Sequence, residues 1–419
     1  MEKRAELPLK DIRVLDVTQV WAGPFATRQF ADMGAEVIKI ESWQRPDWNR
    51  FATRTAPPHK AHLKPPLDSN GTHNALSRNK YGITLDFTRP AGKELFLKLV
   101  KVADVVVENF SAKVMVKLGL GYPELKEVNP GIIMVSMPGF GLYGPDCDRP
   151  AYGTTVEAIS GLMELNGYPD RAPARNAFNY ADPCGGINAV VAVLMALNYR
   201  TRTGKGQQID MAQAEGVSCM IGEAFMEYTM NGRVQQRMGN RDRWLVQGVY
   251  PCGPTGRPPC GPGEDKWVAI SLTGDDDWAK LVDVMGRPSW AQDERFVTHV
   301  SRRHNQDELD RRIGEWTRGR GHIEVQELLQ KGGIAAGAAL NAKEVVENEH
   351  LSARGFFPVI KYAEDEVYPD AGIIWKLSDT PGRVRMPSPG LGEHNRLIYG
   401  GLLGVSEDEM TRLAEEKII

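Results

Sequence analysis

The chain has 419 residues, which is enough for a large hydrophobic core and for two or three domains. Hydrophobic residues make up 42% and charged residues 25% of it, as in ordinary globular proteins. The formal net charge of −3 is too small to indicate a nucleic-acid partner or an acidic tail. Five scattered cysteines are typical of reduced thiols, no apolar run reaches the ~20 residues that span a membrane, and the N-terminus lacks an apolar leader. We therefore expect a cytoplasmic protein without membrane attachment.

The N-terminal part alternates predicted strands and helices. Residues 12–17 are predicted as a buried strand, residues 25–33 as a helix and residues 37–40 as a second strand. This opening is typical of a doubly wound α/β sheet. It is also compatible with dinucleotide binding, with Glu41 as a ribose ligand. The turn at residues 22–24 lacks the G-x-G-x-x-G pattern, which argues against that function.

The same alternation continues to about residue 162, with glycines and polar residues after the strands. Asn109 and Phe110 follow a strand, at the kind of strand end where open α/β sheets bind ligands. Gly139 and Gly141 follow another strand, and glycines there allow the backbone to pass close to a ligand. The further strands are predicted at residues 81–86, 105–107 and 132–136, and the helices at residues 90–99 and 156–162.

Residues 179–186, with the sequence NYADPCGG, precede a long apolar run. Asp182 stands before Pro183, a pattern typical of a helix start in which the carboxylate caps the helix and proline takes the first position. The helix is apolar on every side, which predicts that it is buried. A partly desolvated carboxylate at a helix start can act as a nucleophile. A simple N-cap is the other interpretation, and the residues alone leave both open.

The C-terminal half contains a second, smaller α+β domain. Cys252 and Cys260 have neither the spacing nor the histidine pair of a zinc site, so no metal is expected. In and around this domain, residues 250–252 and 267–271 are predicted as strands and residues 215–230, 276–285, 307–316 and 324–331 as helices. Outside it, residues 209–211 are predicted as a strand and residues 407–415 as a final helix.

Several motifs together resemble one known family. Residues 179–186 resemble the catalytic segment of the class III CoA-transferases, the CaiB/BaiF family that includes formyl-CoA transferase. Residues 199–207 resemble the R-x-x-T-G-x-G-Q turn of that family, and residues 350–357 match its H-L-x-x-R-G-F-F element. Residues 334–337 resemble its G-I-P-x-x-P turn with both prolines replaced, so a turn is expected there. The similarity begins at residues 15–18 and ends at residues 391–394, so it covers nearly the whole chain.

The resemblance implies a fold and an assembly. We expect a Rossmann-like doubly wound large domain, formed by residues 1–224 and continued by residues 326–419, and a small α+β domain at residues 225–325. In this family two chains thread through each other as interlocked rings, so a homodimer, or a heteromer with a related subunit, is implied. Residues 242–244 stand near the place of a glycine-rich lid in formyl-CoA transferase, which puts such a lid in doubt.

The resemblance also implies a mechanism and a set of site residues. Asp182 would attack an acyl-CoA, form a mixed anhydride and then an aspartyl-CoA thioester, and pass CoA to a carboxylic acid. Backbone near Gly185, Gly186, Gly139 and Gly141 would serve the reacting oxygen atoms. Coenzyme A enters as a thioester substrate, possible donors include succinyl-CoA, and no permanently bound cofactor is implied. The residues that match CoA contacts of the family are Val20, Trp21, Ala22, Lys80, Asn109, Phe110 and Lys117.

Three alternatives stay open at this stage. An α-methylacyl-CoA racemase pairs a histidine with the aspartate, but residues 149–153 contain no histidine. An intramolecular CoA transferase, acting as an isomerase, would use the same Asp182. A non-catalytic subunit of a heteromeric CoA-transferase would share the fold without the activity.

Overall fold

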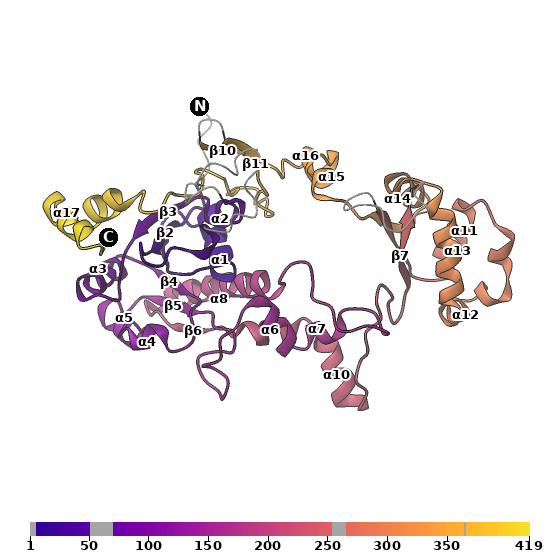
Figure 1. Cartoon of the computed structure of the whole chain (residues 1–419), viewed down its shortest axis with the longest axis horizontal. Helices are drawn as coiled ribbons and strands as arrows, with labels where there is room; N and C mark the ends of the chain where they lie inside the picture. Colours follow the sequence, from indigo (N-terminus) through magenta and orange to yellow (C-terminus); the bar gives the residue numbers. More distant parts are fainter. Residues whose placement is uncertain (1–5, 51–69, 254–264, 364–365) are drawn as a thin grey trace. The chain divides into compact units, whose positions relative to one another are not determined.

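The computed structural model describes residues 6–50, 70–253, 265–363 and 366–419. The chain forms two compact units. The large unit contains residues 1–164, 175–235 and 353–419, and the small unit contains residues 165–174 and 236–352. Figure 1 shows the elements of both units in the colours of the sequence.

A six-stranded sheet organises the large unit. Its order is β3-β2-β1-β4-β5-β6, and every neighbouring pair is parallel. This is the order of a doubly wound dinucleotide-fold sheet, in which the direction of winding reverses between β1 and β4. The α/β doubly wound fold expected from the sequence is therefore confirmed. The strands are β1 (Arg13–Asp16), β2 (Glu36–Glu41), β3 (Lys80–Thr84), β4 (Val105–Glu108), β5 (Ile133–Ser136) and β6 (Gln208–Asp210).

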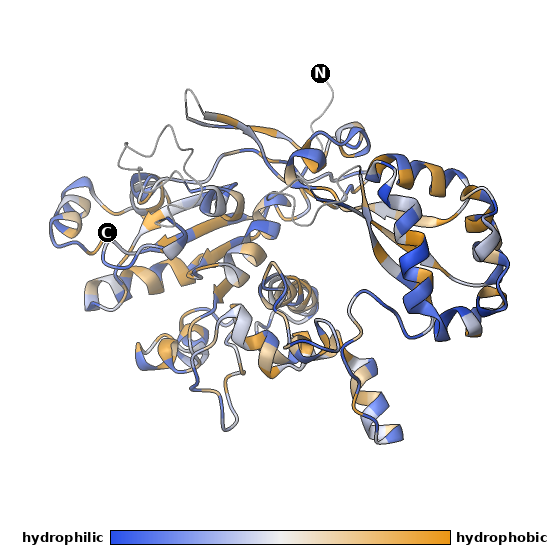
Figure 2. Ribbon diagram, turned by 45° about the vertical axis from the view of Figure 1, so that its right-hand side comes forward, coloured by the Kyte–Doolittle hydropathy of each residue, from blue (hydrophilic) through white to orange (hydrophobic). Residues whose placement is uncertain are grey.

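Helices cover both faces of this sheet, because the strands are apolar on both sides. Val14 belongs to a buried cluster with α1 (Ala22–Asp32) and α8 (Ala181–Thr203), which pack against each other on one face. The next residue, Leu15, belongs to a second cluster on the opposite face, with residues of α3 (Pro90–Lys101), α5 (Tyr122–Val128) and α17 (Glu407–Glu415). The strands of this sheet are largely orange in the hydropathy colouring of Figure 2.

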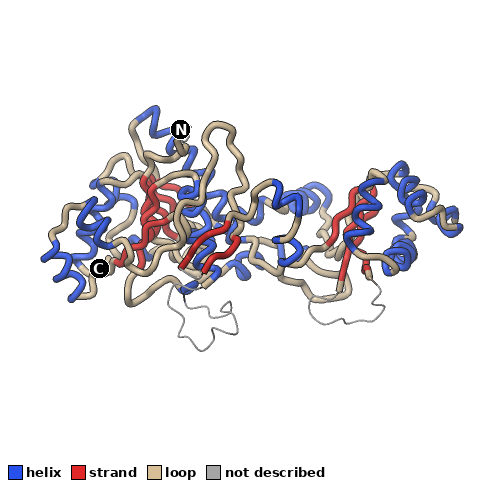
Figure 3. Tube along the Cα trace, turned by 90° about the horizontal axis from the view of Figure 1, so that it is seen from above, coloured by secondary structure: helices blue, strands red, loops and turns tan. Residues whose placement is uncertain are grey.

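Shorter elements complete the large unit. A two-stranded antiparallel sheet of β10 (Val359–Ala363) and β11 (Glu366–Pro369) lies in its C-terminal segment, and Figure 3 shows it as a strand pair apart from the main sheet. The other elements of the unit are η1 (Trp48–Arg50), α2 (Gly71–Ser77), α4 (Val114–Lys117), α6 (Gly153–Ile159), α7 (Leu162–Leu165), α9 (Gln213–Cys219), α10 (Gly222–Asn231) and η6 (Arg396–Leu402).

The small unit is an antiparallel sheet packed against helices. Its strands are β7 (Val246–Cys252), β8 (Lys266–Leu272) and β9 (Ala335–Ala338), in that order. The predicted turn at residues 334–337 is wrong, because these small residues pair with β8 as an edge strand. The helices are α11 (Asp275–Val284), η4 (Ser289–Gln292), η5 (Glu294–Phe296), α12 (His299–His304), α13 (Gln306–Arg318), α14 (His322–Lys331), α15 (Ala342–Val346) and α16 (Glu349–Ala353).

The predicted helix at residues 215–230 is two helices in the structure. Helix α9 ends at Cys219, and α10 begins at Gly222. Between them Ile221 has φ −114° and ψ 28°, outside the helical range. The next residue is Gly222, and glycine destabilises the interior of a helix.

Helix α8 is less buried than its all-apolar sequence predicted. Its side facing α1 is covered, but five large apolar side chains on the other side are 39–66% exposed within the single chain. By length and composition alone α8 is long and apolar enough to cross a membrane, although half of the relevant window is buried inside the protein. The exposed residues are Ile187, Val191, Leu194, Met195 and Tyr199.

Candidate active site

A pocket of about 280 Å³ lies in the large unit at the carboxyl ends of β1 and β4. The winding of the sheet reverses between these two strands, and ligands of doubly wound folds bind at such a point. Four residues expected in the site from the sequence line this pocket, namely Val20, Asn109, Phe110 and Asp182. The other lining residues are Gln19, Ser111, Val114, Pro150, Ala151, Tyr152, Gly153, Val156 and Gln213.

Asp182 occupies the second position of α8 rather than its N-cap. The helix begins at Ala181, because the first turn already forms when the Cys184 N–H donates to the Tyr180 carbonyl over 3.0 Å. Tyr180 is the N-cap residue, and no side-chain capping bond is present at this end. Pro183 therefore stands third in the helix, where its missing N–H still costs no helical bond. The N-cap interpretation of Asp182 is wrong.

The surroundings of Asp182 disfavour its charged form, but its pKa stays below neutral pH. The pKa of Asp182 is raised from 3.8 to about 6, chiefly by burial; a hydrogen bond from the backbone N–H of Ala22 opposes this rise, and the negative charge of Glu157 adds to it. At pH 7 the carboxylate is mostly ionised and poorly solvated. This is the state that a carboxylate nucleophile requires.

Glu157, on α6, is a fully buried carboxylate whose charge acts on the partly buried Asp182. Its side chain is 0% exposed, and Oε1 accepts a hydrogen bond from the backbone N–H of Tyr180. Among the described residues Oε2 has no hydrogen-bond partner. Glu157 thus fixes the residue before α8 and contributes negative charge behind the pocket.

A glycine makes room for the Asp182 carboxylate. A Cβ atom at Gly153 would stand 2.3 Å from Oδ2 of Asp182 and 2.5 Å from Cβ of Asn179. A side chain at position 153 would therefore displace the carboxylate from the pocket. This glycine could not be singled out from the sequence, because nothing in its local pattern indicates that it faces Asp182.

Two of the glycines expected to serve the reacting oxygen atoms, Gly185 and Gly186, pack against neighbouring helices instead of lining the pocket. A Cβ at Gly186 would lie 2.8 Å from Cδ1 of Phe25, so this glycine allows α1 to approach α8. Gly185, in the same helix as Gly186, lies against Gln213 of α9. Neither Gly185 nor Gly186 lines the pocket, and both lie past the first helical turn, whose N–H groups are the free ones.

The two glycines after β5 also lie beside the pocket rather than in it. A Cβ at Gly139 would meet Ala151 at 2.3 Å. Gly141 has φ +83° and faces the carboxylate of Asp210. Both therefore shape the chain around the pocket wall.

Asn109 reaches the pocket but uses its side-chain amide within the protein. Oδ1 of Asn109 accepts from the Gln19 N–H over 2.9 Å, and Nδ2 donates to the Gln19 carbonyl over 2.8 Å. Phe110 follows, with its backbone N–H donating to Oε2 of Glu108 over 2.8 Å. The segment after β4 is thereby tied to the segment after β1, and the two together form one side of the pocket.

Lys80 does not face the pocket. Its side chain is completely buried, and Nζ donates to Oδ2 of Asp16 over 2.9 Å and to Oγ1 of Thr27 over 2.8 Å. Burial lowers the pKa of Lys80 to about 8. The ammonium group is thus enclosed by the protein and does not reach a ligand in this conformation.

The remaining residues expected to contact CoA lie near the pocket but do not line it. Trp21 packs edge-on against Phe178 with a ring-centre distance of 6.2 Å, and Ala22 begins α1. Lys117 is exposed at the end of α4, the helix that contributes Val114 to the pocket. Cys260, one of the two cysteines weighed for zinc, lies outside the described residues.

The comparisons with known proteins identify the family. The model of CoA-transferase family III matches residues 9–395. The chain belongs to this family. A Chloroflexus aurantiacus protein named succinyl-CoA–D-citramalate CoA-transferase is 34% identical over 428 residues, covering 100% of this chain and 99% of the relative. The alpha subunit of a succinyl-CoA–L-malate CoA-transferase from the same organism is 33% identical, covering 99% of this chain and 93% of the relative.

Solved structures agree with this membership. The crystal structure of a CaiB/BaiF family protein from Brucella suis superimposes with a TM-score of 0.82 at 32% identity, covering 95% of this chain and all of that chain. The chain is accordingly a class III CoA-transferase, an enzyme that acts on CoA thioesters. The family resemblance seen in its sequence motifs is confirmed.

Sequence reasoning missed several pocket residues of this CoA-transferase. It also missed Glu157, which lies behind the pocket rather than in its lining, and a charged position inside an otherwise amphipathic helix was the available signal. Gln213 is one of the missed pocket residues, and its Nε2 donates to the Met137 carbonyl over 2.8 Å at the pocket edge. Ser111 immediately follows the recognised Asn109 and Phe110, so only extension of that motif by one residue would have found it.

Proposed function

We propose that this enzyme moves CoA from an acyl-CoA donor to a carboxylic acid acceptor, with Asp182 as the nucleophile. The observation that carries the proposal is the placement of Asp182, a poorly solvated carboxylate lining the pocket at the switch point of the sheet. The Ala22 N–H and the space left by Gly153 orient this carboxylate toward incoming substrate.

The proposed reaction balances without a metal or redox partner. An oxygen of Asp182 attacks the thioester carbonyl of the donor, the C–S bond breaks, and CoA thiolate leaves a mixed anhydride. The thiolate then attacks the carbonyl carbon of Asp182, releasing the donor acid and forming an aspartyl-CoA thioester. The acceptor carboxylate attacks that thioester, releasing the thiolate and forming a second anhydride. Attack of the thiolate on the acceptor carbonyl restores Asp182 and yields the new acyl-CoA.

Succinyl-CoA is the proposed donor for the first assays, because the names of two relatives pair succinyl-CoA with a dicarboxylic acid. The acceptor acid is then found by testing dicarboxylic acids, beginning with D-citramalate and L-malate. An intramolecular CoA transfer would proceed on one acyl-CoA without any added acid, so the requirement for an acceptor separates the two reactions.

A racemase reaction is less well supported by the pocket. Racemisation of an α-methylacyl-CoA needs a base on each side of the carbon that loses its proton. Among the described residues that line the pocket none is a histidine, and Asp182 is the one lining residue with a carboxylate.

The variant Asp182→Asn tests the proposal. Asparagine has nearly the same shape but cannot form an anhydride, so CoA transfer from succinyl-CoA should be abolished. The folded protein should be at least as stable as the wild type at pH 7, because a buried charge is removed. Since the folded pKa lies above 3.8, the stability that Asp182 contributes is present below about pH 4 and is lost as the pH rises through about 6.

The stability gain of the variant should therefore grow from near zero at pH 4 to at most about 3 kcal/mol at pH 7, measured by urea unfolding. Transfer that stays within tenfold of the wild-type rate would rule out Asp182 as the nucleophile.

A further inference from the structure

The turn between β1 and α1 contains a strained residue. Val20 has φ +69°, in the left-handed region, where a β-branched side chain is a genuine outlier. The other described non-glycine residues with positive φ are Asn79, Arg287 and Lys417, none of which is β-branched. Strain of this kind persists only where surrounding groups enforce it, and it occurs often at functional sites.

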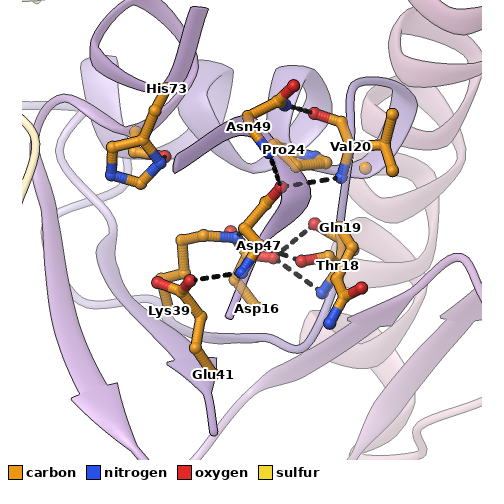
Figure 4. A network of polar contacts seen from close by, with 12 residues as sticks. Asp16, Thr18, Gln19, Val20, Pro24, Lys39, Glu41, Asp47, Asn49 and His73 are labelled. Carbon is orange, nitrogen blue, oxygen red and sulfur yellow. Dashed lines mark hydrogen bonds and ion pairs between the residues drawn. The ribbon is translucent and has the colours of Figure 1, made fainter. Parts of the chain in front are cut away.

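One short segment holds both polar groups of the Val20 backbone (Figure 4). Oδ1 of Asp47 accepts from the Val20 N–H over 3.2 Å and from the Asn49 N–H over 3.0 Å. Nδ2 of Asn49 donates to the Val20 carbonyl. Asp47 is 1% and Asn49 is 5% exposed, so water does not compete for these bonds.

The holding segment is itself fixed to β2 by buried charges. Nζ of Lys39 donates to Oδ2 of Asp47 over 3.1 Å and also to the Thr18 carbonyl over 3.0 Å. Oε1 of Glu41 accepts from the Asp47 N–H over 2.8 Å. Buried ion pairs contribute little net stability, because both charges lose their hydration. Their value here is geometric, since they fix Asp47 and the turn in one arrangement.

The turn determines where α1 begins. Ala22 is the first residue of α1, and the N-cap residue Trp21 provides no side-chain capping bond. The N–H of Ala22 is thus one of the free donors of a helix start, and it lies near enough to the Asp182 carboxylate to lower its pKa. Val20 precedes this donor by two residues, so its backbone conformation sets the direction of the N–H.

We propose that Asp47 and Asn49 are positioning residues of the CoA transfer, which hold Val20 in its left-handed conformation and so direct the Ala22 N–H at Asp182. This inference rests on the proposed role of Asp182. A backbone donor at that place stabilises negative charge on an Asp182 oxygen, in the free carboxylate and in the tetrahedral intermediates formed at its carbonyl carbon.

The variant Asn49→Ala tests the proposal by removing one of the two holding side chains. With succinyl-CoA and the best acceptor found, kcat should fall about tenfold or more because the donor is displaced. The acidic limb of the pH profile of kcat should move up by about one pH unit, since loss of an N–H donor raises the pKa of a carboxylate.

Asn79→Ala is the matched control. Asn79, like Asn49, is buried and holds backbone through its side-chain amide, since its Oδ1 accepts from the N–H groups of Arg385 and Met386. Its partners lie away from the pocket, so this variant should lose stability while the acidic limb stays in place.

A second substitution, Val20→Gly, separates the effect of backbone strain at Val20 from a general loss of stability. Glycine adopts positive φ without penalty, so Val20→Gly should recover part of kcat when added to Asn49→Ala, and should move the acidic limb back toward its wild-type position. If Asn49→Ala does not fold, Asn49→Leu removes the donor without adding a charge, keeps most of the side-chain volume and gives the same two readouts.

A folded Asn49 variant with wild-type kcat and an unmoved acidic limb would overturn the positioning role. If Asp182→Asn is inactive in the same assay, that result leaves the proposed function standing. Activity in Asp182→Asn would instead remove the basis of both.

Discussion

At the scale of single residues, Asp182 is governed by groups that are distant in sequence. Ala22 lies at the start of α1, Glu157 on α6 and Gly153 at the beginning of α6, and each changes what the carboxylate can do. The N–H of Ala22 favours its charge, whereas burial and the charge of Glu157 oppose it. The chemistry of the site thus depends on the contact between α1, α6 and α8.

The pair of carboxylates gives a prediction for pH dependence. In Glu157→Gln the amide oxygen can still accept from the Tyr180 N–H, but the negative charge is gone. The pKa of Asp182 should fall below about 6, so transfer should persist to lower pH, as measured by kcat between pH 4 and 8.

Glu124→Gln, an exposed position on α5, is the control and should leave the profile unchanged. An acidic limb of Glu157→Gln that coincides with that of the wild type would show that Glu157 does not influence Asp182.

The sequence located Asp182 because its motif is local, but it misjudged the helix start. The D-P pair indicates a cap, whereas the preceding residues Asn179 and Tyr180 already accept the first backbone hydrogen bonds. Lys80 was expected at CoA because its motif matched the family. Only the three-dimensional structure shows that Asp16 and Thr27 enclose its ammonium group.

At the scale of elements, the contact of α1 with α8 determines the geometry of the site. Gly186 lies at this contact, where a Cβ would stand 2.8 Å from Phe25 and 2.9 Å from the Ala22 carbonyl. The two helices can approach closely because position 186 has no side chain.

Gly186→Ala should therefore destabilise the protein by about 1–3 kcal/mol through overpacking. It should also slow transfer, because it pushes Ala22 away from Asp182. Thermal unfolding and the rate with succinyl-CoA measure the two effects.

Gly216→Ala on α9 is the matched control. A Cβ there meets its nearest neighbour at 3.5 Å, an ordinary contact, and alanine favours a helix by about 0.5–1 kcal/mol over glycine. Equal stability of the two alanine variants would show that the α1–α8 contact tolerates a side chain.

The regular elements of the sheet could be predicted from the sequence because their signals are local. Strands such as β1 and β5 are short apolar runs, and the start of α17 has a serine cap at Ser406. Strand β9 could not be predicted, because its small residues become a strand only through pairing with β8. The division of the predicted helix at residues 215–230 likewise depends on packing around Ile221.

At the scale of the whole molecule, the exposed side of α8 indicates a partner. Ile187, Val191 and Leu194 are each 42–45% exposed, and Met195 is 66% exposed. A contiguous apolar stripe of this kind marks an interaction surface. We propose that a second copy of the chain covers it, as in the interlocked dimer that the sequence resemblance implies.

Light scattering should therefore give twice the mass of one chain at micromolar concentration. A heteromer with a related subunit, the other assembly expected from the sequence, would instead require a second kind of chain in the active protein. A stable monomer of the purified chain, fully active in transfer, would contradict both forms of the assembly.

The covalent role of Asp182 is the central claim, and oxygen exchange tests it most directly. When the acceptor carboxylate attacks the aspartyl-CoA thioester, the oxygen that joins the two carbonyl carbons is left on Asp182 after the thiolate attacks the acceptor. Turnover with an acceptor acid labelled with oxygen-18 in its carboxylate should therefore place heavy oxygen in the peptide that contains Asp182, as detected by mass spectrometry. Complete turnover with no heavy oxygen in that peptide would contradict the mechanism.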